Sequence, residues 1–558
     1  MFCQAEKCVE SACAGMGASP YLALVALLFL ASTMPASAQS VLQYHNSGTR
    51  SGLYVDPLFN ASSAPTLVLD PTFNVTIPGP VYAQTLYLAN SSLAGRDVIF
   101  VATEQNQVLA VDARSGVTLW NRTLAPPVNG NILLCGNINP SGITGTPVID
   151  TQYGIISFVT LTSANGTLDG VRSLAWALSV LNGAVMPGWP IDIQAALTAQ
   201  NYTFISSNQQ QRGALTLLNG TVYIPYGGLA GDCAEYYGVV VGIPLRTPSA
   251  VQAYVSNGYK GGLWATPGVS TDGVNIFGAA GNTGSLTGFA APEVWSGGEA
   301  LLRLQPGPVF TNSTRDFFAP ADWRALDDAD TDIGSSAALL VDLPGAVPSA
   351  LAVAMGKNGV VYLTDRNNLG GVGGELFQAK VMASVIISTP VAYNTSNGTF
   401  LALASTPGVG CPPGQAGDIV GLQLRAGAPP NFTVAWCAAS RSTSRTALVV
   451  TSPGGNGTAI VWVLGTGGLR GFDGVTGQLV YNGTATFPLL RSWQTPIVAK
   501  GRLYFADDTR LYAFKLAGAP DLPVANNNTI QSLLNATLTR GPVVLPNGTL
   551  GNLSGTLG

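Results

Sequence analysis

Short apolar segments that alternate with tight turns fill the chain from about residue 41 to residue 516. The clearest copy has an apolar run at Val98–Ala102, a turn at 104–106 and a second run that begins at Val108. Paired runs of this length around a short turn are typical of β-hairpins. The pattern therefore predicts an all-β protein built from short strands.

The same unit recurs about eight times. Its leading strands are predicted at residues 98–102, 154–161, 221–226, 274–279, 360–364, 399–404, 460–464 and 503–506. The spacing varies because loops of different lengths separate the units, but repeat periods near ~50 residues indicate propellers or solenoids. We predict a single β-propeller of about eight four-stranded blades, with seven as the alternative.

A propeller closes only when its two ends meet, because an open ring would leave strand edges exposed. We expect the segment 41–75 to complete the blade that contains residues 502–516. The predicted organisation is a signal peptide at 1–38, the propeller at 39–518 and a disordered, glycosylated tail at 519–558.

The N-terminus carries a targeting signal. An apolar run from Tyr21 to Leu30 is followed by small residues that end in an A-x-A site at Ala38. This predicts entry into the eukaryotic secretory pathway and an extracellular or cell-wall location, with an uncleaved anchor as the alternative. No later apolar run is long enough to span a bilayer, so we expect no membrane span in the mature chain.

Asparagine sequons support the same compartment, since many of them lie in Asn-Gly-Thr turns where a glycan would meet solvent. Within the predicted propeller, glycosylation is expected at Asn60, Asn74, Asn90, Asn121, Asn165, Asn201, Asn219, Asn312, Asn394, Asn397, Asn431, Asn456 and Asn482. Four more sequons open at Asn527, Asn535, Asn547 and Asn552 in the tail. The alternative is that Asn, Gly and Thr simply favour turns.

Cysteine usage agrees with an oxidising compartment. Cleavage of the leader would remove Cys3, Cys8 and Cys13 and leave four cysteines, an even number. Three pairings are possible. We favour Cys135 with Cys233 and Cys411 with Cys437, because the second pair brackets one local loop.

The charge and the histidine count exclude two classes of function. Charged residues make up only 10% of the chain, and the net charge of -4 gives no broad positive field for nucleic acid. A single histidine and the lack of C-x-x-C spacing argue against a zinc site.

The run from Ala110 to Trp120 is similar to the pyrroloquinoline-quinone (PQQ) repeat, A-x-D-x-x-[ST]-G-x-x-x-W. Segments 143–150, 211–215, 330–335 and 356–366 also resemble a secreted branch of the quinoprotein alcohol dehydrogenase-like superfamily. The resemblance covers nearly all of the predicted mature chain and implies a β-propeller. The superfamily includes PQQ-dependent dehydrogenases and also binding modules without quinone.

The alcohol-oxidising members have a vicinal Cys-Cys disulfide, a Glu, Asn and Asp set on Ca²⁺ and an Asp base, whereas sugar-oxidising relatives use a His base. This chain has no Cys-Cys pair. Its single histidine, His45, lies in the predicted closing segment, and we expect a polar loop residue there rather than a base.

Several polar and aromatic residues stand beside strand ends, where a propeller places its channel mouth. Candidate channel or ligand residues are Arg212, Trp264, Lys357, Arg441 and Arg491. Charges are scarce in this chain, which favours a ligand or partner for them; the alternative is an ordinary solvated arginine.

A carboxylate group at Asp327, Asp328, Asp330 and Asp332 resembles the start of a calcium loop. The twelfth position is Leu339 instead of glutamate, so the segment is not an EF-hand. Turn capping is the main expectation. A weaker metal prediction places Ca²⁺ on Asp328, Asp330 and Asp332.

Two functions follow. The first is a secreted, non-catalytic binding or scaffold propeller that presents loops to an extracellular carbohydrate or protein. The alternative is a PQQ- and Ca²⁺-dependent oxidoreductase that acts on an alcohol or sugar.

Overall fold

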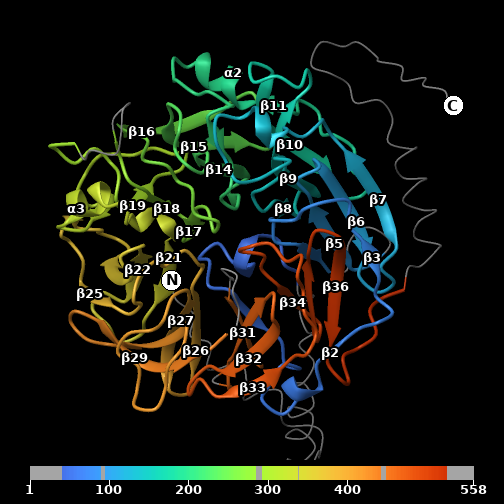
Figure 1. The fold of residues 1–558 in the computed structure, drawn as a ribbon, viewed down its shortest axis with the longest axis vertical. Helices are drawn as coiled ribbons and strands as arrows, with labels where there is room; N and C mark the ends of the chain where they lie inside the picture. Colours follow the sequence, from blue (N-terminus) through green and yellow to red (C-terminus); the bar gives the residue numbers. More distant parts are fainter. Residues whose placement is uncertain are drawn as a thin grey trace, which may run out of the picture. The chain divides into compact units, whose positions relative to one another are not determined.

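Eight antiparallel sheets form the blades of a β-propeller in the computed structural model (Figure 1). The structure describes residues 40–89, 95–284, 292–336, 338–440, 448–455 and 457–524. No helix within these residues is long and apolar enough to cross a membrane. The predicted fold and the number of eight blades are confirmed.

The first four blades follow one another along the chain. Blade one has β4 (Leu86–Leu88), β5 (Val98–Ala102), β6 (Gln107–Asp112) and β7 (Thr118–Thr123), and blade two has β8 (Val148–Asp150), β9 (Ile155–Ser163), β10 (Val171–Ser179) and β11 (Ile191–Asp192). Blade three has β12 (Gln209–Gln210), β13 (Thr216–Leu218), β14 (Thr221–Gly228), β15 (Tyr237–Pro244) and β16 (Gln252–Tyr259). Blade four has β17 (Ser270–Thr271), β18 (Ile276–Ala280), β19 (Ala300–Leu304) and β20 (Phe317–Ala319), to which β24 (Gly371–Val372) adds in parallel.

The other four blades follow the same order. Blade five has β21 (Leu339–Asp342), β22 (Ala350–Met355), β23 (Val360–Asp365) and β25 (Phe377–Lys380), and blade six has β26 (Val391–Thr395), β27 (Gly398–Ala404), β28 (Ile419–Arg425) and β29 (Asn431–Ala438). Blade seven has β30 (Leu448–Ser452), β31 (Ile460–Gly465), β32 (Gly468–Asp473) and β33 (Leu479–Asn482), with β1 (Leu53–Val55) parallel to β30. Blade eight has β34 (Ile497–Ala499), β35 (Arg502–Ala506) and β36 (Arg510–Lys515).

Helices are few and short. The described residues contain α2 (Ile193–Thr198), α3 (Trp323–Asp328) and the 3-10 helices η1 (Tyr44–Asn46), η2 (Ala64–Thr66), η3 (Gly130–Ile132) and η4 (Ile333–Ser335).

The predicted leading strands fall one in each blade, but they are not the innermost strands. Seven of them match the second strand of a blade, and the run at 360–364 matches the third strand of blade five. The innermost strands have only two to five residues, as in β17 (Ser270–Thr271), so their apolar pattern is too short to stand out. Longer, fully buried strands such as β5 carry the sequence signal.

The N-terminal segment closes the ring as predicted. Strands β2 (Val68–Leu69) and β3 (Val75–Thr76) both pair antiparallel with β36 of blade eight. Blade eight therefore joins the two ends of the propeller, and the structure needs no open sheet edge at the junction.

Neighbouring blades bury one another's faces. One apolar cluster unites Val159 of blade two with Ile224 and Val241 of blade three, and another unites Phe400 of blade six with Val461 of blade seven. A single short-stranded sheet could not bury its own apolar faces, so the ring depends on this mutual shielding.

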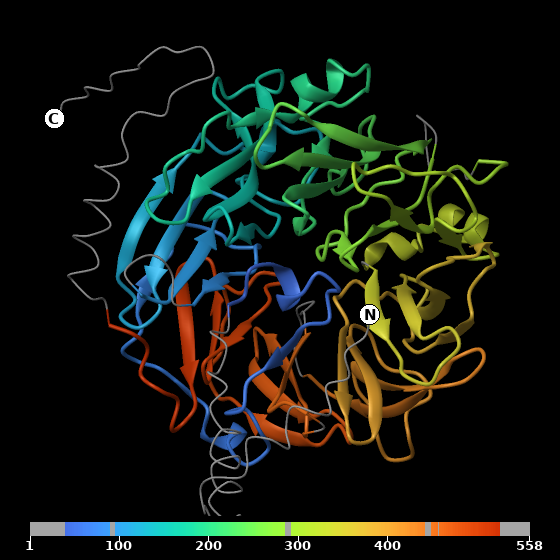
Figure 2. The ribbon, with the colours of Figure 1, turned by 180° about the vertical axis from the view of Figure 1, so that it is seen from behind.

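The chain before β2 runs through the interior of the ring (Figure 2). Between residues 41 and 52 its backbone bonds to the innermost strands β4, β8, β17, β21, β26 and β30. Arg50 reaches blade three through the carbonyl of Leu215, just before β13, and the Tyr44 hydroxyl contacts Thr495, just before β34. We call residues 41–56 the axial segment, because it contacts the inner edge of every blade.

Arg50 anchors the axial segment although it is only 1% exposed. Its guanidinium donates to the carbonyls of Tyr44 at 3.0 Å, Leu215 at 3.0 Å and Val269 at 2.7 Å. Burial lowers the pKa of Arg50 to about 9, but this value is still high enough for the guanidinium to be charged at neutral pH. The guanidinium and the three carbonyls are all buried and satisfy one another, and a buried polar group without a partner lowers the stability of the fold.

Candidate functional site

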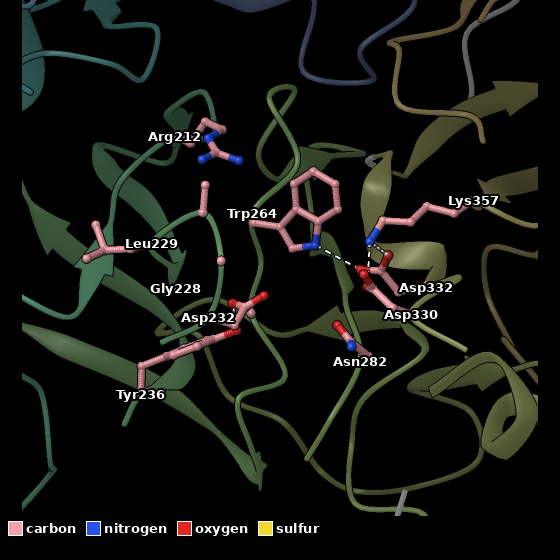
Figure 3. A pocket seen from close by; sticks show the side chains of 13 residues that line it. Arg212, Gly228, Leu229, Asp232, Tyr236, Trp264, Asn282, Asp330, Asp332 and Lys357 are labelled. Atoms are coloured by element: carbon pink, nitrogen blue, oxygen red, sulfur yellow. Dashed lines mark hydrogen bonds and ion pairs between the residues drawn. The ribbon is translucent and has the colours of Figure 1, made fainter. Parts of the chain in front are cut away.

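A cavity of about 280 Å³ opens among the loops of blades three, four and five (Figure 3). We call it the loop pocket. It is lined by Arg212, Gly228, Leu229, Ala230, Gly231, Asp232, Tyr236, Gly262, Trp264, Asn282, Asp330, Asp332 and Lys357. Most of its side chains come from connections between the second and third strands of a blade and from connections between blades, and Arg212 comes from the segment between β12 and β13. Such loops are where a propeller carries its binding residues.

Trp264, Asp332 and Lys357 form a bonded cluster at one side of the pocket. The indole Nε1 donates to Asp332 Oδ2 at 2.9 Å, and Lys357 Nζ lies 2.8 Å from Asp332 Oδ1 and 2.7 Å from Asp330 Oδ1. The ammonium also lies 5.4 Å from the centre of the indole ring. Asp332 is fully buried, so this pairing satisfies a charge that would otherwise be expensive to bury.

The charges of the cluster are matched to one another. Burial raises the pKa of Asp332 and the Lys357 ammonium opposes that shift. Burial works to lower the pKa of Lys357, but the carboxylates of Asp332 and Asp330 outweigh it and raise that pKa. The cluster therefore holds the indole in one orientation with its charges already compensated, before any ligand arrives.

Two glycines make room for this arrangement. A Cβ atom at Gly281 would lie 2.5 Å from Asp332 Oδ2 and 2.9 Å from Trp264 Nε1, so a side chain there would break their hydrogen bond. A Cβ atom at Gly228 would lie 2.3 Å from the Tyr236 ring on the opposite side of the pocket. Close approach of the backbone is thus built into both sides of the cavity.

The glycine-rich loop after β14 forms that opposite side. Tyr236 donates its hydroxyl proton to Asp232 Oδ1 at 2.5 Å, which orients the carboxylate at the pocket. Cys233 in the same loop is bonded to Cys135, 98 residues earlier in the sequence. The second disulfide joins Cys411 and Cys437, so both predicted pairings are confirmed.

The disulfide between Cys135 and Cys233 is expected to hold the glycine-rich loop in place. In the double variant C135S/C233S, limited proteolysis should cleave between residues 229 and 236 much earlier than in the parent, because a tethered loop is released. The matched control is C411S/C437S, which should leave this loop intact. Equal cleavage of the loop in both double variants would show that the disulfide does not order it.

Arg212 separates the loop pocket from a smaller cavity of about 20 Å³ that Tyr82 and Trp493 line. Its Nη2 donates to Gln210 Oε1 at 2.9 Å. Burial lowers the pKa of Arg212, and the carboxylates of Asp232 and Glu104 oppose the shift. Unlike Lys357, this guanidinium makes no direct ion pair with a carboxylate among the described residues.

The structure brings together five of the residues singled out from the sequence: Arg212, Trp264, Lys357, Asp330 and Asp332 all line the loop pocket. Arg491 lies elsewhere, in an ion pair with Asp508 and over the Tyr82 ring. Asp328 is exposed and is not part of the pocket lining. Arg441 lies outside the described residues.

His45 lies in the turn η1 of the axial segment, and nothing in the sequence indicated that this turn is buried. The residue is 0% exposed, with Nδ1 3.2 Å from the Arg50 carbonyl oxygen. Burial lowers the pKa of His45 to about 3, so the ring is neutral at ordinary pH. A polar residue in a turn-like sequence gives no sign that the turn will be enclosed by eight blades.

Asp232, Tyr236 and Asn282 line the pocket but were not predicted from the sequence. One signal was available for the first two. The stretch Gly227-Gly228-Leu229-Ala230-Gly231 follows a predicted strand and is followed directly by Asp232 and Cys233. Cys233 was expected to form a disulfide with Cys135. A glycine-rich loop allows close approach to a ligand, and a disulfide holds it in place, which are properties of a binding element.

Two of the carboxylates in and beside the loop pocket are engaged by protein groups and do not form a Ca²⁺ site of their own. Calcium needs six to eight oxygen ligands. Among the described residues no group of three or more His, Cys, Asp or Glu side chains has metal-binding spacing. The carboxylates are engaged instead: Asp332 bonds Trp264 and Lys357, and Asp327 accepts from the Thr283 N–H and hydroxyl, each at 2.6 Å.

All predicted glycosylation sites that the structure describes are accessible. Asn60 and Asn431 are half-buried, and Asn74, Asn121, Asn165, Asn201, Asn219, Asn312, Asn394, Asn397 and Asn482 are exposed. Asn90 and Asn456, the leader and the tail from residue 525 lie outside the described residues. In blade three, Asn219 lies just before β14, at the end of that strand opposite to Gly228 in the loop pocket.

No family model and no curated protein matches this sequence. Among solved structures, the quinohemoprotein alcohol dehydrogenase from Comamonas testosteroni is similar over 87% of this chain and 82% of its own, with a TM-score of 0.56 and 13% identity. A europium-containing methanol dehydrogenase is similar over 86% of this chain and 99% of its own, with a TM-score of 0.56 and 12% identity. At such identities the likeness shows a shared fold. The resemblance to the PQQ-repeat propellers is therefore confirmed as a common eight-bladed architecture.

Proposed function

We propose that this protein is a secreted, non-catalytic binding propeller whose loop pocket takes a sugar unit of a neutral extracellular carbohydrate. The observation that carries the proposal is the oriented Trp264 ring beside a ring of polar side chains. Sugars present apolar C–H faces and hydroxyl groups together, which an aromatic face and hydrogen-bonding groups recognise in combination. Asp232, Asn282 and Arg212 line the same pocket as the Trp264 indole and supply hydrogen-bond acceptors and donors.

Size and charge support this class of ligand. The cavity of about 280 Å³ is at the small end of ligand pockets, which suits one sugar ring more than an extended peptide. Two cations, Arg212 and Lys357, are opposed by three carboxylates, Asp232, Asp330 and Asp332. An anionic ligand would meet net repulsion, whereas a neutral polyol can bond to both signs of charge.

Compartment features are consistent with an extracellular role. The two disulfides are of the kind that persists in oxidising environments. The leader, the sequons and the scarcity of charged residues support secretion and glycosylation.

Binding is tested by screening the full secreted protein against neutral glycans and then by calorimetric titration with the best one. W264A is expected to weaken binding by up to about tenfold, since an aromatic contact contributes about 0.5–1.5 kcal/mol. The matched control is W120A: Trp120 is also half-buried and donates to a backbone carbonyl, that of Val180, but lies in blade one. D232A provides a second pocket variant should W264A be unstable.

A second assay on the same secreted protein tests the oxidoreductase alternative. PQQ and Ca²⁺ are added to the protein, and quinone absorbance and dye reduction with alcohols or sugars are recorded. Stoichiometric quinone binding with dye reduction would replace the binding proposal with the oxidoreductase alternative. Equal affinity of the W264A and parent proteins for the glycan would remove the loop pocket as the binding site.

A further inference from the structure

A second cavity, of about 270 Å³, lies between the outer strand β16 of blade three and two loops of blade four. We call it the outer groove. Its lining consists of Tyr254, Asn257, Val294, Trp295, Ser296, Gly297, Phe310 and Asn312. None of these residues belongs to the loop pocket.

The outer groove has an aromatic wall and exposed apolar edges. Tyr254 and Phe310 meet edge to face with ring centres 5.6 Å apart, and Trp295 stacks on Phe317 at 4.0 Å. Val294 beside them is 77% exposed and Val309 is 49% exposed. Apolar groups gathered on a surface in this way mark a place that another group covers.

Asn312 stands in this groove and opens the sequon Asn312-Ser313-Thr314. Asn312 is exposed and lies in the loop between β19 and β20, with a φ of 57°. Of all the sequon asparagines in the chain, Asn312 alone has an aromatic residue two positions earlier, namely Phe310. A glycan on Asn312 would thus begin within the groove, next to the aromatic wall.

We propose that Asn312 carries an N-glycan whose first sugar residues lie in the outer groove, against Phe310 and Tyr254. In the secretory pathway the Asn312 amide nitrogen attacks the anomeric carbon of a lipid-diphosphate-linked oligosaccharide. The new C–N bond replaces the C–O bond to the diphosphate, the amide nitrogen loses one proton and the lipid diphosphate leaves. The attached sugar then sets its C–H face on the rings, with its polar groups toward Asn257 and Ser296.

This assignment is independent of the carbohydrate proposed for the loop pocket. The glycan of Asn312 is covalent and intramolecular, and it covers a groove of a different pair of blades. Its expected effects are protection of the glycan itself and stabilisation of the apolar edge formed by Val294.

The test uses full-length protein secreted from a glycosylating host. Peptide mass spectrometry measures occupancy at Asn312, and release of each glycan by a peptide-N-glycosidase is then followed on the folded protein. The comparison site is Asn397, an exposed turn asparagine with Thr395 two residues earlier. Release at Asn312 is expected to be roughly two- to tenfold slower than at Asn397, the protection that one or two aromatic contacts provide.

The variant F310L keeps an apolar side chain and the sequon but removes the ring. Release at Asn312 should then approach the rate at Asn397. F310A is the second variant, and the thermal midpoint of both confirms that they fold. An empty Asn312, equal release at the two sites in the parent protein, or slow release that F310L does not accelerate would each overturn the proposal.

Discussion

Replacing Arg50 with methionine is expected to lower the free energy of unfolding by about 5 kcal/mol. The substitution keeps an unbranched apolar stem but removes the donors that satisfy the carbonyls of Tyr44, Leu215 and Val269. Hydrogen bonds to a charged group contribute about 1.5–3 kcal/mol each, and the carbonyls would stay buried without partners. R50K keeps the charge without the planar fork, so an intermediate loss is expected.

Urea unfolding measures the effect as a lower midpoint with little change in slope. The control is R315M, because Arg315 is exposed and donates to the Asn367 carbonyl at the surface. An R50M protein as stable as R315M would mean that the axial segment does not secure the inner edges of the blades.

Stability should fall as pH rises from about 4.5 to 7, and Glu104 accounts for much of the fall. Its side chain is fully buried, and Oε2 accepts from the Gly142 N–H at 2.5 Å. Burial raises the pKa of Glu104 from 4.5 to about 7. Below pH 4.5 both folded and unfolded chains hold the proton. Above it the unfolded chain releases the proton first, so folding is disfavoured by about 3 kcal/mol once pH exceeds 7.

The variant E104Q separates this residue from the other carboxylates. It should match the parent near pH 4 and exceed its stability at pH 8 by up to about 3 kcal/mol, since the neutral amide retains an acceptor for Gly142. Burial also raises the pKa of Asp327 to about 6 and that of Glu299, so a residual slope of the same sign is expected. E235Q removes an exposed carboxylate as a control. A pH profile of E104Q parallel to that of the parent would contradict the assignment.

The fold was predictable because its signal is repeated and local. Each blade contributes one long apolar strand, and the loop after Asp112 shows why the turn pattern recurs. Asp112 Oδ1 accepts from the N–H groups of Arg114 and Ser115 at 3.1 and 2.8 Å, and Gly116 takes a φ of 73°. Residue type and backbone geometry agree at such turns, so the sequence specifies them without reference to the rest of the molecule.

The site was only partly predictable, because it depends on distances across the ring. Lys357 and Trp264 are 93 positions apart in the sequence, yet they share Asp332. Lys357 and Arg212 could be singled out because charged residues are scarce in this chain, so each one is a stronger candidate for contact with a ligand or partner. Asn282 carried no such mark, as asparagine is common in turns. The burial of His45 likewise follows only from the path of the axial segment through the ring.

The central claim is that the loop pocket binds a neutral sugar unit against Trp264. A crystal structure of the full secreted protein with the best glycan from the screen tests it most directly. The account predicts a sugar ring on the Trp264 indole within hydrogen-bonding distance of Asp232, Asn282 or Arg212. A sugar bound at another face, or a quinone held in the interior of the ring, would contradict it.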